Sequence, residues 1–231
     1  MARITRKELK QDKFAAEVSH TVEYVAEHRT QLVRAGIAVA AVLVVAAGIY
    51  FYVRHQRTVR EQALADAIRI QDTLVGPAGA DVPTFPTQEA KDKEVSKAFN
   101  AVIDKYPGSN EAAVAHYFLG ALAADQGKFS DAEKHLKVAV ESASKAYASL
   151  AKMALAEVYF STGRIGDGEK LLRDLMAHPT AFVSREEATI ALARGLERTR
   201  PQEARKLLEP LRTSRTAISQ VAIGALGEVE R

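Results

Sequence analysis

The feature that most constrains this chain is an uncharged apolar run near its N-terminus, AGIAVAAVLVVAAGIYFYV, at residues 35–53. At about 1.5 Å per residue, a helix of this length is close to the roughly 30 Å hydrocarbon core of a bilayer. Arginines flank the run on both sides, and an aromatic cluster stands at residues 50–52, as in interfacial belts. A buried core helix would show a polar stripe, and a cleaved signal peptide has a shorter apolar stretch. We therefore predict one transmembrane helix over residues 32–53.

The basic residues around this run bear on its orientation. Seven Lys or Arg residues precede it, and four follow it closely. Over the whole tail this count favours a cytoplasmic N-terminus, although the nearest few residues lean the other way. We predict that residues 1–31 are a cytoplasmic tail. Apolar residues at helical spacing over residues 6–29 fit either an amphipathic helix on the membrane surface or a partly ordered tail.

The composition favours helices and excludes several classes of protein. Alanine dominates the apolar residues, and it is the best helix former. The absence of cysteine excludes disulfides, cysteine-ligated zinc, iron–sulfur clusters and thiol nucleophiles. The net charge of +3 comes from the residues near the apolar run, and the chain beyond residue 60 is mildly acidic. This distribution fits a membrane flank, and we predict no nucleic-acid binding.

Beyond the predicted span, turn residues divide the chain into helices. Residues 58–74 have helical spacing, and Gly76-Pro77 ends that helix. Residues 76–90 hold three prolines and two glycines and are predicted to form a loop. A second helix is predicted from about residue 89 to residue 106, where Pro107-Gly108-Ser109 follows, and Asn110 can cap the next helix.

The sequence then repeats at an offset of 36 residues, at which residues 120–140 align with residues 156–176. Gly127 and Gly163 occupy equivalent places, and each is predicted to end the first helix of a pair in a left-handed turn. Small residues where paired helices cross are each followed four positions later by a leucine that fills the layer: Ala132 with Leu136, Gly168 with Leu172, and Ala204 with Leu208. Three passes at one period predict stacked helical hairpins.

The third unit is weaker than the first two. Thr199 replaces the turn glycine, and Gly195 stands where Tyr159 stands in the second unit. Residues 214–231 are predicted to form a terminal helix that covers the last open face. We predict an all-α chain in which an N-terminal transmembrane helix is followed by a solenoid of helical hairpins over residues 57–231.

The repeat resembles the tetratricopeptide repeat (TPR). In that motif Leu-Gly is followed by Tyr, Gly, Ala, a large apolar residue and Ala over about 34 residues. The best match in this chain consists of Leu119, Gly120, Gly127, Ala132, Leu136 and Ala139. The fold class that the resemblance implies is a TPR-like α-solenoid, and such solenoids bind other proteins.

The whole layout is similar to the YfgM-like family, with its charged tail, one span, a linker and degenerate TPR units. Members of that family are ancillary subunits of the SecYEG translocon, anchored in the bacterial inner membrane with their repeats in the periplasm. The resemblance implies protein partners, namely translocon subunits, periplasmic chaperones or unfolded clients, and a role in passing translocated polypeptides to chaperones. An envelope or cell-division scaffold that organises a multiprotein complex through TPR repeats remains the alternative.

No pattern in the sequence indicates catalysis. The six histidines form no helical metal pair, and no phosphate-binding loop or nucleophile motif is present. His116 is predicted to pack on the inner face of a repeat helix, and His135 to lie on an exposed face. We therefore predict no catalytic residue, metal, cofactor or small-molecule substrate.

The repeat pattern also predicts a concave groove lined by the first helix of each hairpin. The predicted groove residues are mostly apolar with isolated acids: Tyr117, Ala121, Ala124, Leu150, Met153, Glu157, Phe160, Glu186 and Thr189, together with Val114, Ala193 and Leu196. Such a groove suits an apolar segment with a few cationic residues, and Met153 can repack around different ligands. Tyr117 and Met153 could equally well pack between adjacent repeats.

Overall fold

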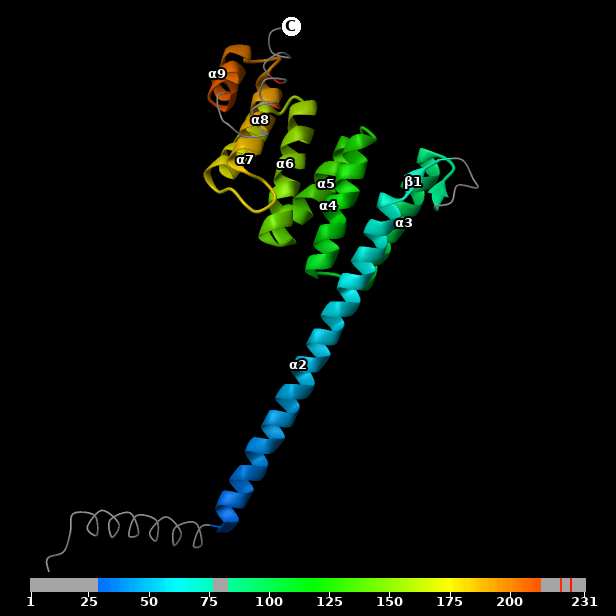
Figure 1. The fold of residues 1–231 in the computed structure, drawn as a ribbon, viewed down its shortest axis with the longest axis vertical. Coiled ribbons are helices and arrows are strands. Elements are labelled where there is room, and N and C mark those ends of the chain that lie inside the picture. The colour runs from blue at the N-terminus through cyan, green and yellow to red at the C-terminus, as the bar shows by residue number, and fades with distance from the viewer. Residues whose placement is uncertain (1–28, 77–82, 213–220, 222–224, 226–231) are drawn as a thin grey trace, which may run out of the picture. The chain divides into compact units, whose positions relative to one another are not determined.

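The fold was examined in a computed structural model of the chain, which describes residues 29–76 and 83–212 and the single residues Val221 and Ala225 (Figure 1). The amphipathic helix predicted over residues 6–29 and the terminal helix predicted over residues 214–231 lie almost wholly outside the described residues. The chain divides into two compact units, Met1–Thr58 and Val59–Arg231.

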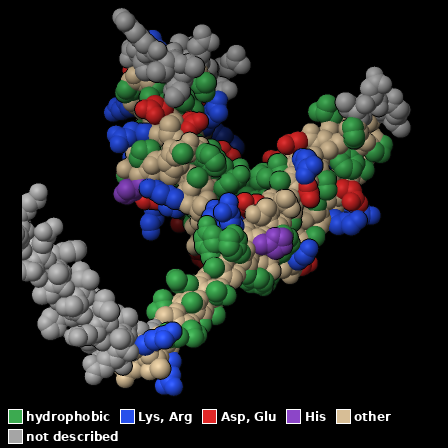
Figure 2. All heavy atoms as spheres, turned by 60° about the horizontal axis from the view of Figure 1, so that its bottom comes forward, with side chains coloured by type: hydrophobic (Ala, Val, Ile, Leu, Met, Phe, Trp, Pro, Cys, Tyr) green, Lys and Arg blue, Asp and Glu red, His purple; other side chains and the backbone are tan. Residues whose placement is uncertain are grey.

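The first helix, α2 (Arg29–Asp72), contains the apolar run. Its apolar side chains are exposed, with Val42 at 67% and Val44 at 72% of their full accessible surface. Figure 2 shows hydrophobic side chains along this part of α2, with Lys or Arg side chains at its end. Among the described residues, α2 is the one helix long and apolar enough to cross a membrane, judged by length and composition alone.

The second unit is helical apart from one small β-ladder in the described residues. Strands β1 (Leu74–Val75) and β2 (Thr84–Phe85) pair in parallel, with Leu74 opposite Thr84. Helix α3 (Gln88–Lys105) follows, and the Thr87 hydroxyl caps it by accepting a hydrogen bond from the Ala90 amide. The strand β2 and the start of α3 thus occupy part of the 76–90 stretch that the prolines and glycines predicted to be a loop.

Three helical hairpins follow along the chain, each a first helix and a second helix. They are α4 (Asn110–Asp125) with α5 (Phe129–Ser142), α6 (Lys145–Ser161) with α7 (Ile165–Ala177), and α8 (Arg185–Leu196) with α9 (Pro201–Arg212). Each helix packs on the next, and the first helices also contact one another, α4 with α6 and α6 with α8. The all-α, solenoid-like class predicted from the repeat is confirmed.

The turn glycines end the first two hairpin helices as the repeat predicts. Gly127 and Gly163 have positive φ angles of 69° and 78°. After Gly127, the Lys128 amide donates to the Ala123 carbonyl at 2.8 Å, which is the long-range bond of a Schellman cap. The third hairpin has Thr199 at this position and no positive φ, because a β-branched residue does not tolerate the left-handed region.

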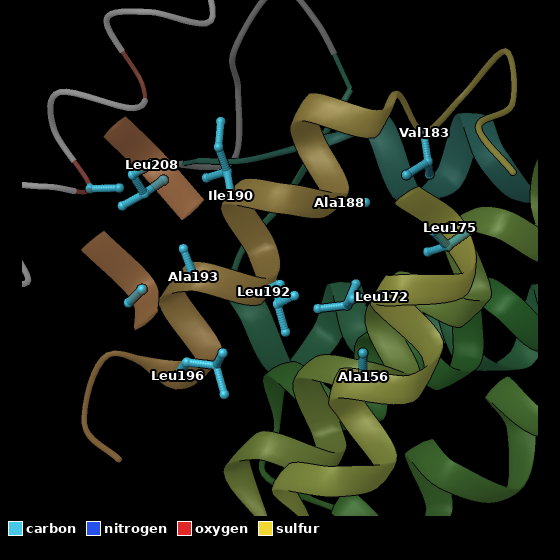
Figure 3. Close-up of a cluster of buried hydrophobic side chains, with 12 residues drawn as sticks. Ala156, Leu172, Leu175, Val183, Ala188, Ile190, Leu192, Ala193, Leu196 and Leu208 are labelled. Atoms are coloured by element: carbon cyan, nitrogen blue, oxygen red, sulfur yellow. The ribbon is translucent and has the colours of Figure 1, made fainter. Parts of the chain in front are cut away.

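The small and bulky residues of the repeat form the layers of the core. All six of the residues predicted to alternate at the helix crossings are buried: Ala132, Leu136, Gly168, Leu172, Ala204 and Leu208. Figure 3 shows the largest cluster, in which Leu172, Leu192 and Leu208 come from three successive helices. Because each hairpin buries its apolar face on its neighbours, the array is stable only as a stack.

Charged side chains join successive hairpins at the same 36-residue period. Glu133 on α5 accepts hydrogen bonds from Arg164 at 2.9 Å and pairs with Lys137 at 2.7 Å. Glu169 on α7 pairs in the same way with Arg200 and Arg173. Hydrogen bonds from Lys137 and Arg164 lower the pKa of Glu133 to about 2. These charged residues recur at the 36-residue period of the sequence, but the period does not show which of them contact each other.

Candidate protein-binding groove

Two hollows lie side by side along the first helices of the hairpins. The smaller has a volume of about 310 Å³ and is lined by α4 and α6. The larger, of about 460 Å³, is lined by α6 and α8 together with Val221. Met153, Glu157 and Ser161 line both hollows, so the two adjoin at α6. We call this surface the groove.

Seven of the nine predicted groove residues line the two hollows. Six are in the smaller hollow, namely Tyr117, Ala121, Ala124, Leu150, Met153 and Glu157. Phe160 lines the larger hollow. They come together because α4 and α6 carry the same face of the repeat and end in the same glycine turn.

The prediction is wrong for the third hairpin. Thr189 is 7% exposed, and its hydroxyl donates to the Arg185 carbonyl at 2.7 Å, so it faces the core. Glu186 lines neither hollow. The side chains of α8 that do line the groove are Glu187, Ile190, Ala191, Arg194 and Gly195. Most of the α8 lining thus lies one position later than predicted.

This shift has a local cause. The connection from α7 to α8 spans residues 178–184, whereas α5 and α6 are joined by residues 143–144 alone. A longer connection does not hold α8 in the rotation that the repeat period implies. Ala193 and Leu196 are therefore fully buried. Val114 of the first hairpin is also fully buried, so it packs in the core and does not line the groove.

Several groove residues both pack and remain accessible. The Tyr117 ring lies 5.1 Å from the Phe118 ring and 6.0 Å from that of Tyr147, centroid to centroid, and Tyr117 remains half-buried. Burial raises its pKa, and Tyr147 and Glu157 add to that rise. Met153 is half-buried and contacts the core cluster of the last two hairpins. Tyr117 and Met153 thus pack against neighbouring side chains, as the alternative interpretation predicted, and they also remain accessible in the groove.

Phe160 has a structural role that the sequence did not reveal. A Cβ atom added to Gly195 would lie 2.2 Å from Cε2 of Phe160, and one added to Gly168 would lie 3.0 Å from the same ring. The ring therefore fills the space that side chains would occupy on α7 and α8. This explains why glycine stands at position 195, where the second repeat has tyrosine.

Glu157 is the acidic side chain that lines both hollows. It is exposed to solvent, and partial burial of its carboxylate raises its pKa. Asp125 raises the pKa further, and Arg194 acts in the opposite direction. The walls of the hollows thus combine apolar side chains such as Leu150 and Ile190 with charged ones, namely Asp125, Glu157, Glu187 and Arg194.

Outside the groove, the structure places two histidines together that the sequence analysis treated separately. The Nδ1 atoms of His116 on α4 and His135 on α5 lie 2.8 Å apart, at hydrogen-bond distance. His135 is half-buried, so the prediction of an exposed face is wrong for it. Burial lowers the pKa of both rings, and Lys134 lowers both further.

The described residues offer no group of three or more histidine, cysteine or carboxylate side chains placed to hold a metal ion.

An aromatic row extends from Tyr117 through Tyr147 to Phe182. The Phe182 ring lies 5.3 Å from that of Tyr147, and Phe182 is 47% exposed. Phe182 lies in the connection before α8, outside the helical pattern, so the repeat did not predict it.

The profile of a protein family described as a tetratricopeptide repeat-like domain matches residues 29–193, which is more than half of the chain. This chain belongs to that family. Comparisons with curated proteins and with solved structures gave no match. TPR-like domains are typically protein-binding modules without enzymatic activity. The matched range ends within α8, shortly before Thr199, which replaces the turn glycine.

Proposed function

We propose that this TPR-like protein is a membrane-anchored adaptor that binds polypeptide segments in its groove. In this proposal residues 1–31 form the tail, residues 32–53 cross the membrane once, and residues 57–231 carry the groove. The anchor is supported by the exposed apolar length of α2. A soluble protein seldom leaves so many large apolar side chains in water.

The observation that carries the binding function is the groove itself. Three first helices contribute to two adjoining hollows, in which Tyr117, Leu150 and Met153 are half-buried and reachable. Concave surfaces that combine apolar side chains with placed polar groups are common binding sites of proteins. A methionine that lines both hollows can adapt to ligands of different shape, as binding of many clients requires.

We further propose that the adaptor is an ancillary subunit of the SecYEG translocon that passes translocated polypeptides to periplasmic chaperones. The N-terminal tail is then cytoplasmic, the membrane is the bacterial inner membrane, and the repeats are periplasmic. The resemblance of the whole layout to the YfgM-like family supports this role. An apolar groove beside a translocon meets unfolded segments before they bury their apolar residues.

The test is crosslinking in intact membranes. A photoreactive amino acid is placed at Ala121, a groove position on α4, and the adducts are identified by mass spectrometry. Adducts with several secretory polypeptides, together with co-purification of translocon subunits, are the expected result. A single stoichiometric partner unrelated to secretion would favour the scaffold alternative. The absence of any polypeptide adduct would refute the binding function.

A further inference from the structure

The junction of the two hollows carries an acidic side chain that the repeat pattern does not require. Glu157 lines both hollows. At the equivalent position one repeat earlier the chain has Ala121, which lines the smaller hollow. A small residue therefore satisfies the packing at this position, and the glutamate is an addition to it.

The Glu157 carboxylate differs in its partners from three other acids of the hairpins, Glu133, Glu169 and Glu187. Glu187, which also lines the groove, accepts hydrogen bonds from the Ser184 amide at 2.7 Å and from the Ser184 hydroxyl at 2.9 Å. Glu133 and Glu169 are paired with arginines. Within the part of the chain that the structure describes, no side chain donates a hydrogen bond to Glu157.

The surroundings of Glu157 make a cation the favourable addition. Partial burial desolvates its carboxylate. Arg194 and Asp125 act on it with opposite signs, and the effect of Arg194 is the larger, but Arg194 makes no hydrogen bond to it. A desolvated carboxylate without a hydrogen-bonded partner is unfavourable, and a cation brought by a ligand would offset that cost.

The two hollows lie on either side of this acid. Tyr117 and Leu150 line the smaller hollow, and Phe160 and Ile190 line the larger one. A ligand that fills both hollows with apolar side chains must cross Glu157 between them. An acidic segment would be repelled by Glu157 and Asp125, and a wholly apolar one would bury the carboxylate without a partner.

We propose that the groove selects polypeptide segments in which a lysine or arginine stands between apolar residues, with Glu157 as the group that binds the cation. This inference rests on the proposed function, because it names the kind of segment that the groove receives. The apolar residues supply most of the affinity, and the cation supplies the selectivity and fixes the register of the segment.

The test uses the full chain in nanodiscs of neutral lipid, with empty nanodiscs as the blank. Two labelled peptides are compared by fluorescence anisotropy: one has a lysine between two pairs of leucines, and the other has norleucine in place of that lysine. The variants are Glu157→Gln and a matched control, Asp104→Asn, which removes one exposed charge on α3. Far-UV circular dichroism checks that both variants keep their helix content.

We expect Glu157→Gln to weaken binding of the lysine peptide by about threefold or more, as for a partly screened ion pair. Binding of the norleucine peptide should stay unchanged or become tighter, and Asp104→Asn should change neither. Binding of both peptides without any effect of Glu157→Gln on the lysine peptide would overturn this inference and leave the proposed function standing. If neither peptide bound the wild-type protein, both would fail.

Discussion

Helices α4 and α5 approach closely at Gly120, and this contact decides whether an added methyl group there stabilises or destabilises the fold. A Cβ atom added to Gly120 would lie 2.6 Å from Cγ of Leu136 and 3.2 Å from its backbone nitrogen. Leu136 is fully buried, so it has no open space into which to turn. We predict that Gly120→Ala forces the two helices apart and destabilises the first hairpin, although alanine is the better helix former.

The magnitude follows from two opposing contributions. Replacing glycine by alanine inside a helix normally stabilises it by about 1 kcal/mol. Overpacking a tight core costs about 1–3 kcal/mol, so the net result at Gly120 is a loss of up to about 2 kcal/mol. The matched control is Gly166→Ala in the first turn of α7, where an added Cβ meets nothing within 4 Å. That change should be neutral or stabilising by up to about 1 kcal/mol.

The assay is thermal unfolding of the full chain, followed by far-UV circular dichroism. For a chain of this size, each kcal/mol shifts Tm by about 2–4 °C. The Gly120→Ala variant should therefore melt at a temperature up to about 8 °C below the wild type, and Gly166→Ala at or slightly above it. If Gly120→Ala melted at or above the wild-type temperature, the inferred contact with Leu136 would be wrong.

Three further predictions concern the protonation of two histidines, the ion pairs between successive hairpins and the membrane anchor. Burial lowers the folded-state pKa of His116 and His135, so the unfolded chain binds more protons than the folded chain. Tm should therefore fall as the pH drops below about 6.5, and replacing both histidines by Gln should flatten that dependence. Glu133→Gln should lower Tm modestly at neutral pH, and Arg164→Gln should add little to it in a double-mutant cycle, because the two share one ion pair. The full chain should stay in the membrane pellet after alkaline extraction, whereas a chain without residues 29–53 should be released; release of the full chain would contradict the anchor.

The repeat period predicted the core residues because the requirements of a helix end and of a close helix crossing are met by residues near one another in the sequence. A helix that must end in a left-handed residue needs glycine, which is why Gly127 and Gly163 could be assigned to turns in advance. Likewise, the alternation of Ala132 with Leu136 predicted a buried layer, because two helices can approach closely only over a small side chain.

The groove was predictable only while the repeat held its register. The first two hairpins share a glycine turn, and seven of their predicted residues line the two hollows. In the third, Thr199 replaces that glycine and a longer connection precedes α8, so the rotation of α8 is set by tertiary packing. The contact of His116 with His135 was missed for a related reason: it depends on how two helices face each other, which spacing along one chain does not specify.

The most direct test of the central claim compares the two faces of the hairpin array. Binding of an unfolded secretory polypeptide to the full chain is measured for a groove variant, Tyr117→Ala with Met153→Ala, and for a control variant, Lys134→Ala with Lys170→Ala, whose side chains are exposed on the second helices. We predict that the groove variant binds at least about tenfold more weakly, the loss expected when central anchors are truncated, and that the control binds like the wild type. Equal affinity of the groove variant and the wild type, with helix content intact in both, would contradict the claim that this groove holds polypeptide.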